Sequence, residues 1–257
     1  MRIVVLVKEV PDTYGARKLD LETGLALRDA GDKVLDEVGE RALEVAISYA
    51  ESAPGTEVVA LTAGPESAAN SVRKALAMGA DRAVHVADDA LAGADLTLTS
   101  QVLAAALADL SADLILAGNV STDGSGGVIP AMIAERLGLA NVTALDSVEL
   151  AEGVLRGERA ADGGRSKVEA SLPVVASITE QLPDPRFASL KGIMAAKKKP
   201  YDTLSLASLG VDADALVPRS IMIAVAEHPP REAGVKVVDS GDAGHQLAEF
   251  LARKGLV

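Results

Sequence analysis

The stretch that decides the fold is residues 113–137, DLILAGNVSTDGSGGVIPAMIAERL. Its apolar run, residues 114–117, is too short for a helix and predicts a strand buried on both faces of a parallel sheet. Residues 129–137 have helical spacing, and Gly138 predicts their end. The small and polar residues between them predict a loop that leads from the carboxyl end of a strand to the amino end of a helix. Such a loop suits a phosphate group, because glycines let the backbone come close and the helix start offers free N–H groups.

A flexible connection is the alternative reading of that loop, because it contains neither G-x-G-x-x-G nor the lysine-containing phosphate loop. The rest of the first half supports a nucleotide-binding fold, since short apolar runs alternate there with helical spacing. Strands are predicted at residues 3–7, 57–61 and 83–86, and helices at 36–50, 66–78 and 96–110, with Asp36 and Asp95 as caps. This alternation predicts right-handed βαβ units, and so an α/β fold with a doubly wound, mostly parallel, Rossmann-like sheet.

The second half predicts added antiparallel strands and a carboxyl-terminal arm. Strands are expected at residues 144–150, 154–160, 166–170 and 174–179, with hairpin turns at Glu152-Gly153 and Asp162-Gly163-Gly164. A short helix near 205–209, a strand at 221–225 and a tail helix over about 243–254 follow. We expect three parts: an α/β nucleotide-binding domain at 1–182, a partner-recognition loop at 183–200, and an arm with a helix at 201–257.

Composition excludes several classes of function. The chain has 257 residues, 49% of them hydrophobic, no cysteine and a formal net charge of -12. Disulfides and cysteine-based zinc sites are therefore absent, and general nucleic-acid binding is disfavoured. No apolar run reaches the ~20 residues of a membrane span, and a strand begins the chain with no signal segment before it, so we expect a cytoplasmic protein without membrane insertion.

No catalytic constellation is recognisable either. The three histidines, His85, His228 and His245, show no metal-ligand spacing, and no serine lies in a nucleophile elbow. We therefore expect no metal and no catalytic residue, and a binding or carrier function rather than an enzyme.

Residues 183–200 combine basic and apolar side chains inside an acidic protein. This pattern predicts a docking surface for an acidic partner, whereas the alternative is a solvated loop whose apolar residues fold back on the core. The basic residues are Arg186, Lys191, Lys197, Lys198 and Lys199, and the apolar ones are Phe187, Leu190, Ile193 and Met194.

The same segment, PDPRFASLKGIMAAKKKP, resembles the signature of the electron transfer flavoprotein beta subunit, approximately N-x-P-R-[YF]-x-x-[LF]-x-x-I-M-x-A-K-K-K. Three other stretches resemble that family: VVLVKEVPDT at 4–13, LTAGPESAANSVRKALAMGADRAVHV at 61–86, and AGNVSTDGSGG at 117–127. The resemblance covers essentially the whole chain and implies an adenine-nucleotide alpha-hydrolase-like fold. It also implies a heterodimer with an alpha subunit that mainly holds FAD at the interface. Electrons then come from acyl-CoA and related dehydrogenases, as in fatty acid beta-oxidation, and go to a quinone reductase.

The resemblance further implies that this subunit binds structural AMP. The implied contacts come from the end of the first strand, the start of the first helix, the end of the second strand and the glycine-rich loop. They are Leu6, Asp36, Glu37, Val38, Gly39, Ala63, Gly118, Asn119, Val120, Ser121, Thr122, Asp123, Gly124, Ser125, Gly126, Gly127, Val128 and Ile129. The family often has Asn-Pro where this chain has Asp36-Glu37.

The dehydrogenase-recognition loop of the family corresponds to residues 178–200, with Leu190 at the anchoring leucine, and the carboxyl-terminal arm is expected to pack on the partner subunit. A bifurcating subgroup instead binds a second FAD with a loop resembling DGDTAQVGP. This chain has DGSGGVIP at 123–130, without the threonine and glutamine, which favours AMP. A free-standing nucleotide-binding or nucleotide-hydrolysing protein of the same fold is the remaining alternative.

Overall fold

The computed structural model describes residues 1–213, 222–231 and 233–257. The chain divides into two compact units, Met1–Ile223 and Ala224–Val257. The first unit contains the sheets and the segments predicted to form the site. In the second unit, helix α6 (Ala243–Arg253) is amphipathic and leaves Leu247 and Phe250 exposed.

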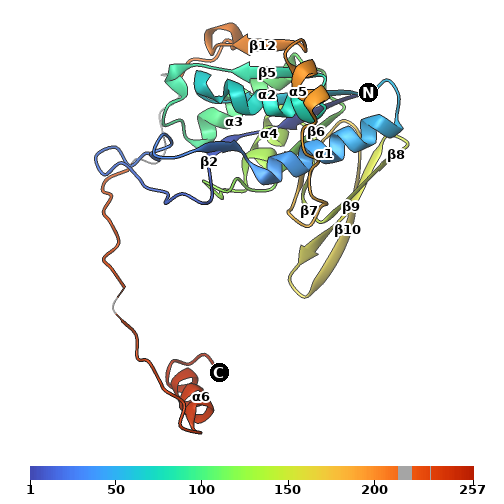
Figure 1. Ribbon diagram of the computed structural model, residues 1–257. Coiled ribbons are helices and arrows are strands. Elements are labelled where there is room, and N and C mark those ends of the chain that lie inside the picture. The colour runs from blue at the N-terminus through green and yellow to red at the C-terminus, as the bar shows by residue number, and fades with distance from the viewer. Residues whose placement is uncertain (214–221, 232) are drawn as a thin grey trace. The chain divides into compact units, whose positions relative to one another are not determined.

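Seven strands of the described residues form one sheet in which every neighbouring pair is parallel (Figure 1). Their order is β12-β5-β4-β1-β6-β11-β7. The bounds are β1 Arg2–Leu6, β4 Glu57–Ala63, β5 Arg82–Val86, β6 Leu114–Gly118, β7 Ala140–Leu145, β11 Val174–Ile178 and β12 Tyr201–Leu204. The predicted parallel α/β fold is confirmed. The winding reverses between β1 and β6, and this is where open α/β sheets bind their ligands.

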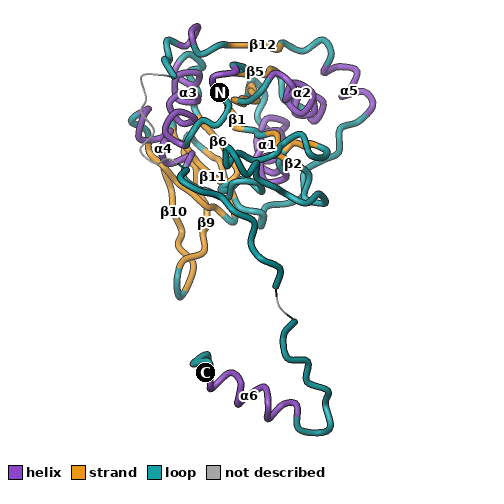
Figure 2. Tube along the Cα trace, turned by 90° about the vertical axis from the view of Figure 1, so that its left-hand side faces the viewer, coloured by secondary structure: helices purple, strands orange, loops and turns teal. Residues whose placement is uncertain are grey.

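Helices cover both faces of this sheet, which explains why its strands are apolar throughout. Ile3 and Val5 point into one cluster with α1 (Glu37–Ser52) and α2 (Ala69–Met78). Val4 and Leu6 point into the other, with α3 (Leu96–Ala108) and α4 (Ile129–Leu137). Figure 2 shows α1 and α2 on one side of the strands and α3 and α4 on the other. Short 3-10 helices are η1 (Glu66–Ala68), η2 (Asp89–Leu91) and η3 (Ala207–Leu209).

Predicted caps determine where these helices begin and end. Asp36 accepts a hydrogen bond from the Val38 N–H and caps α1, and Asp95 caps α3 through the Leu98 N–H. Gly138 ends α4 with a left-handed φ of 65°, a conformation that only glycine adopts without strain.

The antiparallel strands form smaller sheets of their own. β8 (Ser147–Ala151), β9 (Val154–Ala161) and β10 (Gly164–Ser171) pair in the order β10-β9-β8, with the predicted turns between them. The single strand predicted at 144–150 is wrong: β7, irregular at Ala144 with a φ of 56°, ends at Leu145, and β8 starts at Ser147. A further pair, β2 (Glu9–Pro11) and β3 (Lys33–Leu35), was not predicted, because three-residue strands are too short for a periodic pattern.

The carboxyl-terminal part of the first unit also differs from expectation. Residues 183–200, predicted as a loop, contain helix α5 (Leu190–Ala196), capped by Ser189, which accepts a hydrogen bond from the Gly192 N–H. Tyr201–Leu204, predicted to begin the arm, form β12 at the sheet edge, a half-polar strand fastened by the Arg82–Asp202 ion pair of 2.6 Å. Of the strand predicted at 221–225, Ile221 lies outside the described residues. Residues 222–225 form no strand, because an apolar run becomes a strand only where a sheet edge is available to pair with it.

Candidate functional site

The four segments expected to surround a nucleotide come together at the carboxyl edge of the parallel sheet. Leu6, Ala63 and Gly118 end the adjacent strands β1, β4 and β6. The start of α1 packs directly against the end of β6. A Cβ at Gly118 would lie 3.0 Å from Cγ1 of Val38, so this close approach depends on glycine.

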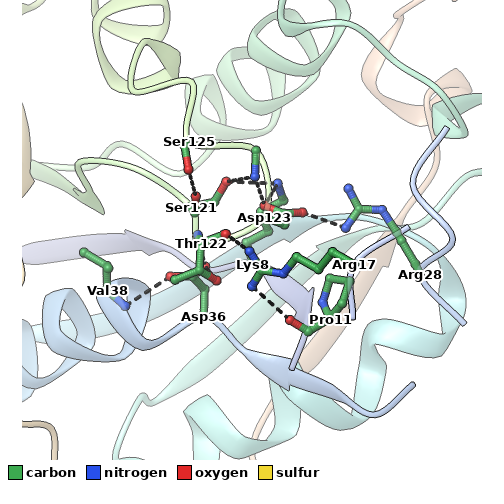
Figure 3. A network of polar contacts seen from close by, with 11 residues as sticks. Lys8, Pro11, Arg17, Arg28, Asp36, Val38, Ser121, Thr122, Asp123 and Ser125 are labelled. Carbon is green, nitrogen blue, oxygen red and sulfur yellow. Dashed lines mark hydrogen bonds and ion pairs between the residues drawn. The ribbon is translucent and has the colours of Figure 1, made fainter. Parts of the chain in front are cut away.

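Asp36 ties the start of α1 to the glycine-rich loop. Its side chain is 2% exposed, and one carboxylate oxygen accepts the Val38 N–H at 3.1 Å. The other oxygen accepts both the N–H of Thr122 at 2.7 Å and its hydroxyl at 2.9 Å (Figure 3). The carboxylate is therefore fully engaged in positioning the loop, which gives it a clear role although the family often has asparagine there.

Asp123 is the second anchor of the loop. Its carboxylate, 7% exposed, accepts Nζ of Lys8 at 2.8 Å and Nη1 of Arg28 at 2.7 Å (Figure 3). Burial raises the pKa of Asp123, but the hydrogen bonds from Lys8, Ser121 and Arg28 outweigh it and hold the pKa well below its usual range. Asp123 is thus ionised and neutralised by two cations within the site.

Three basic residues around the loop were not among the predicted site residues. Lys8 also donates to Oγ of Ser121 at 3.2 Å, and Arg17 donates to the carbonyl oxygen of Thr122. Lys8 directly follows the strand predicted at 3–7, so its place at the ligand-binding edge was readable from the sequence. Arg17 and Arg28 lie in an irregular segment about a hundred residues before the loop, and no periodic pattern reveals such a pairing.

The remaining loop residues lead from these anchors to the start of α4. Asn119 is fixed by its N–H, which donates to the carbonyl oxygen of Ile178 at 2.8 Å. Residues 124–128 are exposed, and Gly127 has a φ of 66°. The capping residue of α4 is Val128, which makes no side-chain cap. In the first turn of α4, the N–H groups of Ile129 and Ala131 are consequently available to an anion, whereas Pro130 has none.

A hollow of about 520 Å³ lies beside the loop. It is lined by the segment 11–32, including Tyr14, Arg17 and Lys18, and by Asp123. Tyr14 is exposed, so an aromatic side chain and two cations line this hollow.

The predicted docking segment presents an apolar row to solvent. Phe187, Leu190 and Met194 are 98%, 83% and 72% exposed, and Ile193 is also exposed. Leu190, Ile193 and Met194 share a face of α5, being three and four residues apart. These side chains do not fold back on the core, so the alternative reading of the segment is wrong; docking of an acidic partner stays a prediction.

The basic residues of this segment fall into two groups. Lys191, Lys197 and Lys198 are exposed. Arg186 instead binds Glu44 and Glu51 of α1, and Lys199 donates to the carbonyl oxygens of Leu76 and Ala80 at the end of α2. Only the first group is free to face a partner.

Among the described residues, no group of three or more histidine, cysteine, aspartate or glutamate side chains could hold a metal ion. His85 is buried, with Nδ1 2.8 Å from the Tyr201 hydroxyl and Nε2 3.2 Å from the carbonyl oxygen of Gly64. Burial lowers the pKa of His85, so it is a neutral core residue. No helix in the described parts of the chain is both long and apolar enough to cross a membrane.

A parallel sheet with helices on both faces, whose winding reverses between β1 and β6 beside a glycine-rich loop, defines the class of doubly wound α/β proteins. Residues 24–209 match the electron transfer flavoprotein domain family. Over 263 aligned positions and 99% of both chains, the sequence is 46% identical to electron transfer flavoprotein subunit beta of Mycobacterium bovis. It is 35% identical to the same subunit of Bacillus subtilis, over 98% of this chain and 96% of that one. It is also 33% identical to caffeyl-CoA reductase-Etf complex subunit CarD of Acetobacterium woodii, over 99% and 97% of the two chains.

The chain belongs to the electron transfer flavoprotein family and is similar to its beta subunits along its whole length.

Proposed function

We propose that this chain is the AMP-binding beta subunit of a heterodimeric electron transfer flavoprotein. It pairs with an alpha subunit that mainly holds FAD at the interface, takes electrons from acyl-CoA and related dehydrogenases, and passes them to a quinone reductase in the cytoplasm. The chain itself is an electron-carrier subunit without a catalytic constellation. The observation that carries the proposal is the meeting of β1, β4, β6 and the start of α1 around the loop 118–129.

AMP is supported by the chemistry of this edge. The exposed loop residues 124–128 and the uncapped start of α4 offer backbone N–H groups to one phosphate. Leu6 and Ala63 end β1 and β4 at the same edge of the sheet as the loop. The Leu6 side chain is buried in the core, so it is the backbone of Leu6 and the small side chain of Ala63 that we assign to the nucleotide.

A second FAD, as in a bifurcating-type subunit, is the alternative. The sequence of the loop disfavours it: residues 123–130, DGSGGVIP, lack the threonine and glutamine of the loop that the bifurcating subgroup has.

Nucleotide extraction tests the proposal. The chain is co-expressed with its alpha partner, the yellow complex is denatured, and the released nucleotides are separated and quantified. We expect AMP and FAD in near-equal amounts. Two FAD and no AMP would refute AMP binding and move the protein to the bifurcating class.

The isolated chain provides the matching control. Without an alpha partner it should be colourless and should reduce no dye, because its flavin contacts form only one side of an interface. A chain that carries stoichiometric flavin and reduces dye alone contradicts the division of labour between the subunits. A nucleotide-hydrolysing activity of the isolated chain would favour the free-standing alternative.

Dehydrogenase docking is assigned to the row Phe187, Leu190, Ile193 and Met194, with Lys191, Lys197 and Lys198 at its rim. The support is the exposure of these apolar side chains on an ordered helix. Exposed apolar anchors that insert into a partner's pocket are typical hot spots, and rim charges chiefly steer the encounter.

A further inference from the structure

Arg186 lies at the start of the docking segment, directly before the exposed Phe187. Its guanidinium binds one face of α1, where Glu44, Ser48 and Glu51 stand four and three residues apart. Nε and Nη2 donate to the two carboxylate oxygens of Glu44 at 2.8 and 2.9 Å, and Nη1 and Nη2 donate to those of Glu51 at 2.5 and 3.0 Å. The guanidinium therefore grips two carboxylates, each with a pair of hydrogen bonds.

The backbone of the same residue is held as well. The N–H of Arg186 donates to Glu44 at 3.0 Å. Arg41 of α1 donates to the carbonyl oxygen of Leu182, four residues before Arg186, and binds Asp184. Both main chain and side chain of residues 182–186 are thus fastened to α1, which fixes the direction in which the chain approaches α5.

The other end of the segment is fastened to α2. A Cβ added at Gly192 would overlap the carbonyl oxygen of Ala77, so α5 lies directly on α2. Nζ of Lys199 donates to the carbonyl oxygens of Leu76 at 3.0 Å and Ala80 at 2.6 Å, where the negative end of the α2 dipole lies. The apolar row lies between two anchors, one on α1 and one on α2.

Arg186 has a side-chain exposure of 32%, and Glu44 of 16%. Burial alone raises the pKa of Glu44, but its hydrogen bonds with Arg186 lower it overall. Glu51 and Glu44 raise the pKa of Arg186 in turn. The two carboxylates more than balance the positive charge of the guanidinium and occupy its N–H groups, which leaves Arg186 little capacity to bind a partner's carboxylate.

We propose that Arg186 is a positioning residue, which orients the docking segment from α1 and does not itself touch the dehydrogenase. The proposal rests on the docking function assigned above to the apolar row. It separates Arg186 from Lys191, Lys197 and Lys198, which share its charge but point to solvent. Pre-orienting Phe187 and Leu190 removes the need to order them during association.

Amide hydrogen exchange tests the positioning role without any partner. In the alpha–beta complex, Arg186→Gln should speed exchange by about tenfold at residues 192–196, whose N–H groups are hydrogen-bonded in the capped helix α5, since charge-assisted hydrogen bonds of this kind stabilise by more than that factor. Lys197→Gln, which removes a positive charge from the same segment beyond the last residue of α5, should leave exchange there unchanged. Unchanged exchange in Arg186→Gln overturns the proposal, whatever the dehydrogenase does.

A mutant cycle then distinguishes positioning from direct contact. The readout is reduction of the complex by a purified acyl-CoA dehydrogenase supplied with octanoyl-CoA. If Arg186 acts through α1, Arg186→Gln and the pair Glu44→Gln with Glu51→Gln slow reduction by a similar factor, about tenfold, and the triple variant is no slower. If Arg186 touches the dehydrogenase, the glutamate pair leaves reduction unchanged or faster, and the proposal falls.

The salt dependence of the association rate and the variant Leu190→Ala provide two further tests. Arg186→Gln should keep the salt dependence of the association rate, whereas Lys197→Gln should flatten it. A loss of salt dependence in Arg186→Gln points to direct contact and overturns positioning. If Leu190→Ala leaves reduction intact, the docking function itself is wrong, and the exchange measurement still decides whether Arg186 orients the segment.

Discussion

Leu190→Ala separates docking from folding, because this side chain is 83% exposed in the first residue of α5. Burying a leucine side chain completely stabilises by about 1.5–3 kcal/mol. Because the side chain is exposed in the free complex, most of this free energy is gained only when Leu190 enters a partner's pocket. Truncation should therefore cost about 2 kcal/mol of binding free energy, or about 30-fold in Kd. In the free complex the substitution removes little buried apolar surface, and alanine is the better helix former. The free energy of unfolding should therefore change by less than about 0.5 kcal/mol.

The assay is stopped-flow reduction of the flavin by an acyl-CoA dehydrogenase at subsaturating concentrations of the complex. We expect kcat/KM to fall about 30-fold, chiefly through faster dissociation, with unchanged AMP content, flavin content and melting temperature. Leu76→Ala is the control, because Leu76 is fully buried on α2 and its truncation should cost about 2–5 kcal/mol of stability. Intact transfer in Leu190→Ala, or a drop in its melting temperature, would mean that the residue is ordinary packing.

Three other changes examine the anchors of the site and of the docking helix. Asp123→Asn should lower the free energy of unfolding by about 1–3 kcal/mol at pH 7. A carboxyl whose pKa is lowered by folding stabilises the fold at pH values above its unfolded pKa, so the stability difference between the wild type and Asp123→Asn should shrink as the pH falls below about 4. Urea unfolding at several pH values measures this difference, and a pH-independent difference contradicts the ion-pair assignment. Asp36→Ala removes the α1 cap and both bonds to Thr122, so less AMP per FAD should be extracted from the complex, and full AMP retention would disprove the loop-positioning role. Gly192→Ala forces α5 away from α2, so it should cost about 1–3 kcal/mol of stability and slow reduction by the dehydrogenase. Gly244→Ala is the control and should do neither, because a Cβ meets open space there. Equal melting curves for the two variants would show that α5 is not closely packed on α2.

The fold was predictable wherever burial is continuous along the chain. β1, β4, β5, β6 and β11 are apolar on both faces because helices cover the sheet on both sides, so each reads as a short hydrophobic run. Edge elements give no such pattern. β12 is Tyr-Asp-Thr-Leu, and only its pairing with β5 and the contact of Asp202 with Arg82 make it a strand.

The same contrast holds for the site. The carboxyl ends of the strands and the glycine-rich loop were predictable because they are local features of the chain. The partners of Asp123 were not, since Arg28 lies 95 residues away in sequence within an irregular segment. Helix α5 was not predicted for another reason. Its apolar residues face solvent instead of the core, and helix prediction from hydrophobic spacing assumes that the apolar face is buried.

The position of β12 has a consequence for biosynthesis. β12 is the last strand of the parallel sheet to leave the ribosome, yet it covers the edge of β5, which was synthesised more than a hundred residues earlier. Until Tyr201–Leu204 emerge, the nascent chain carries an open, largely apolar edge strand, RAVHV, of the kind that pairs with other chains and aggregates. A chain truncated before Tyr201 should therefore be poorly soluble even though most of its core is present.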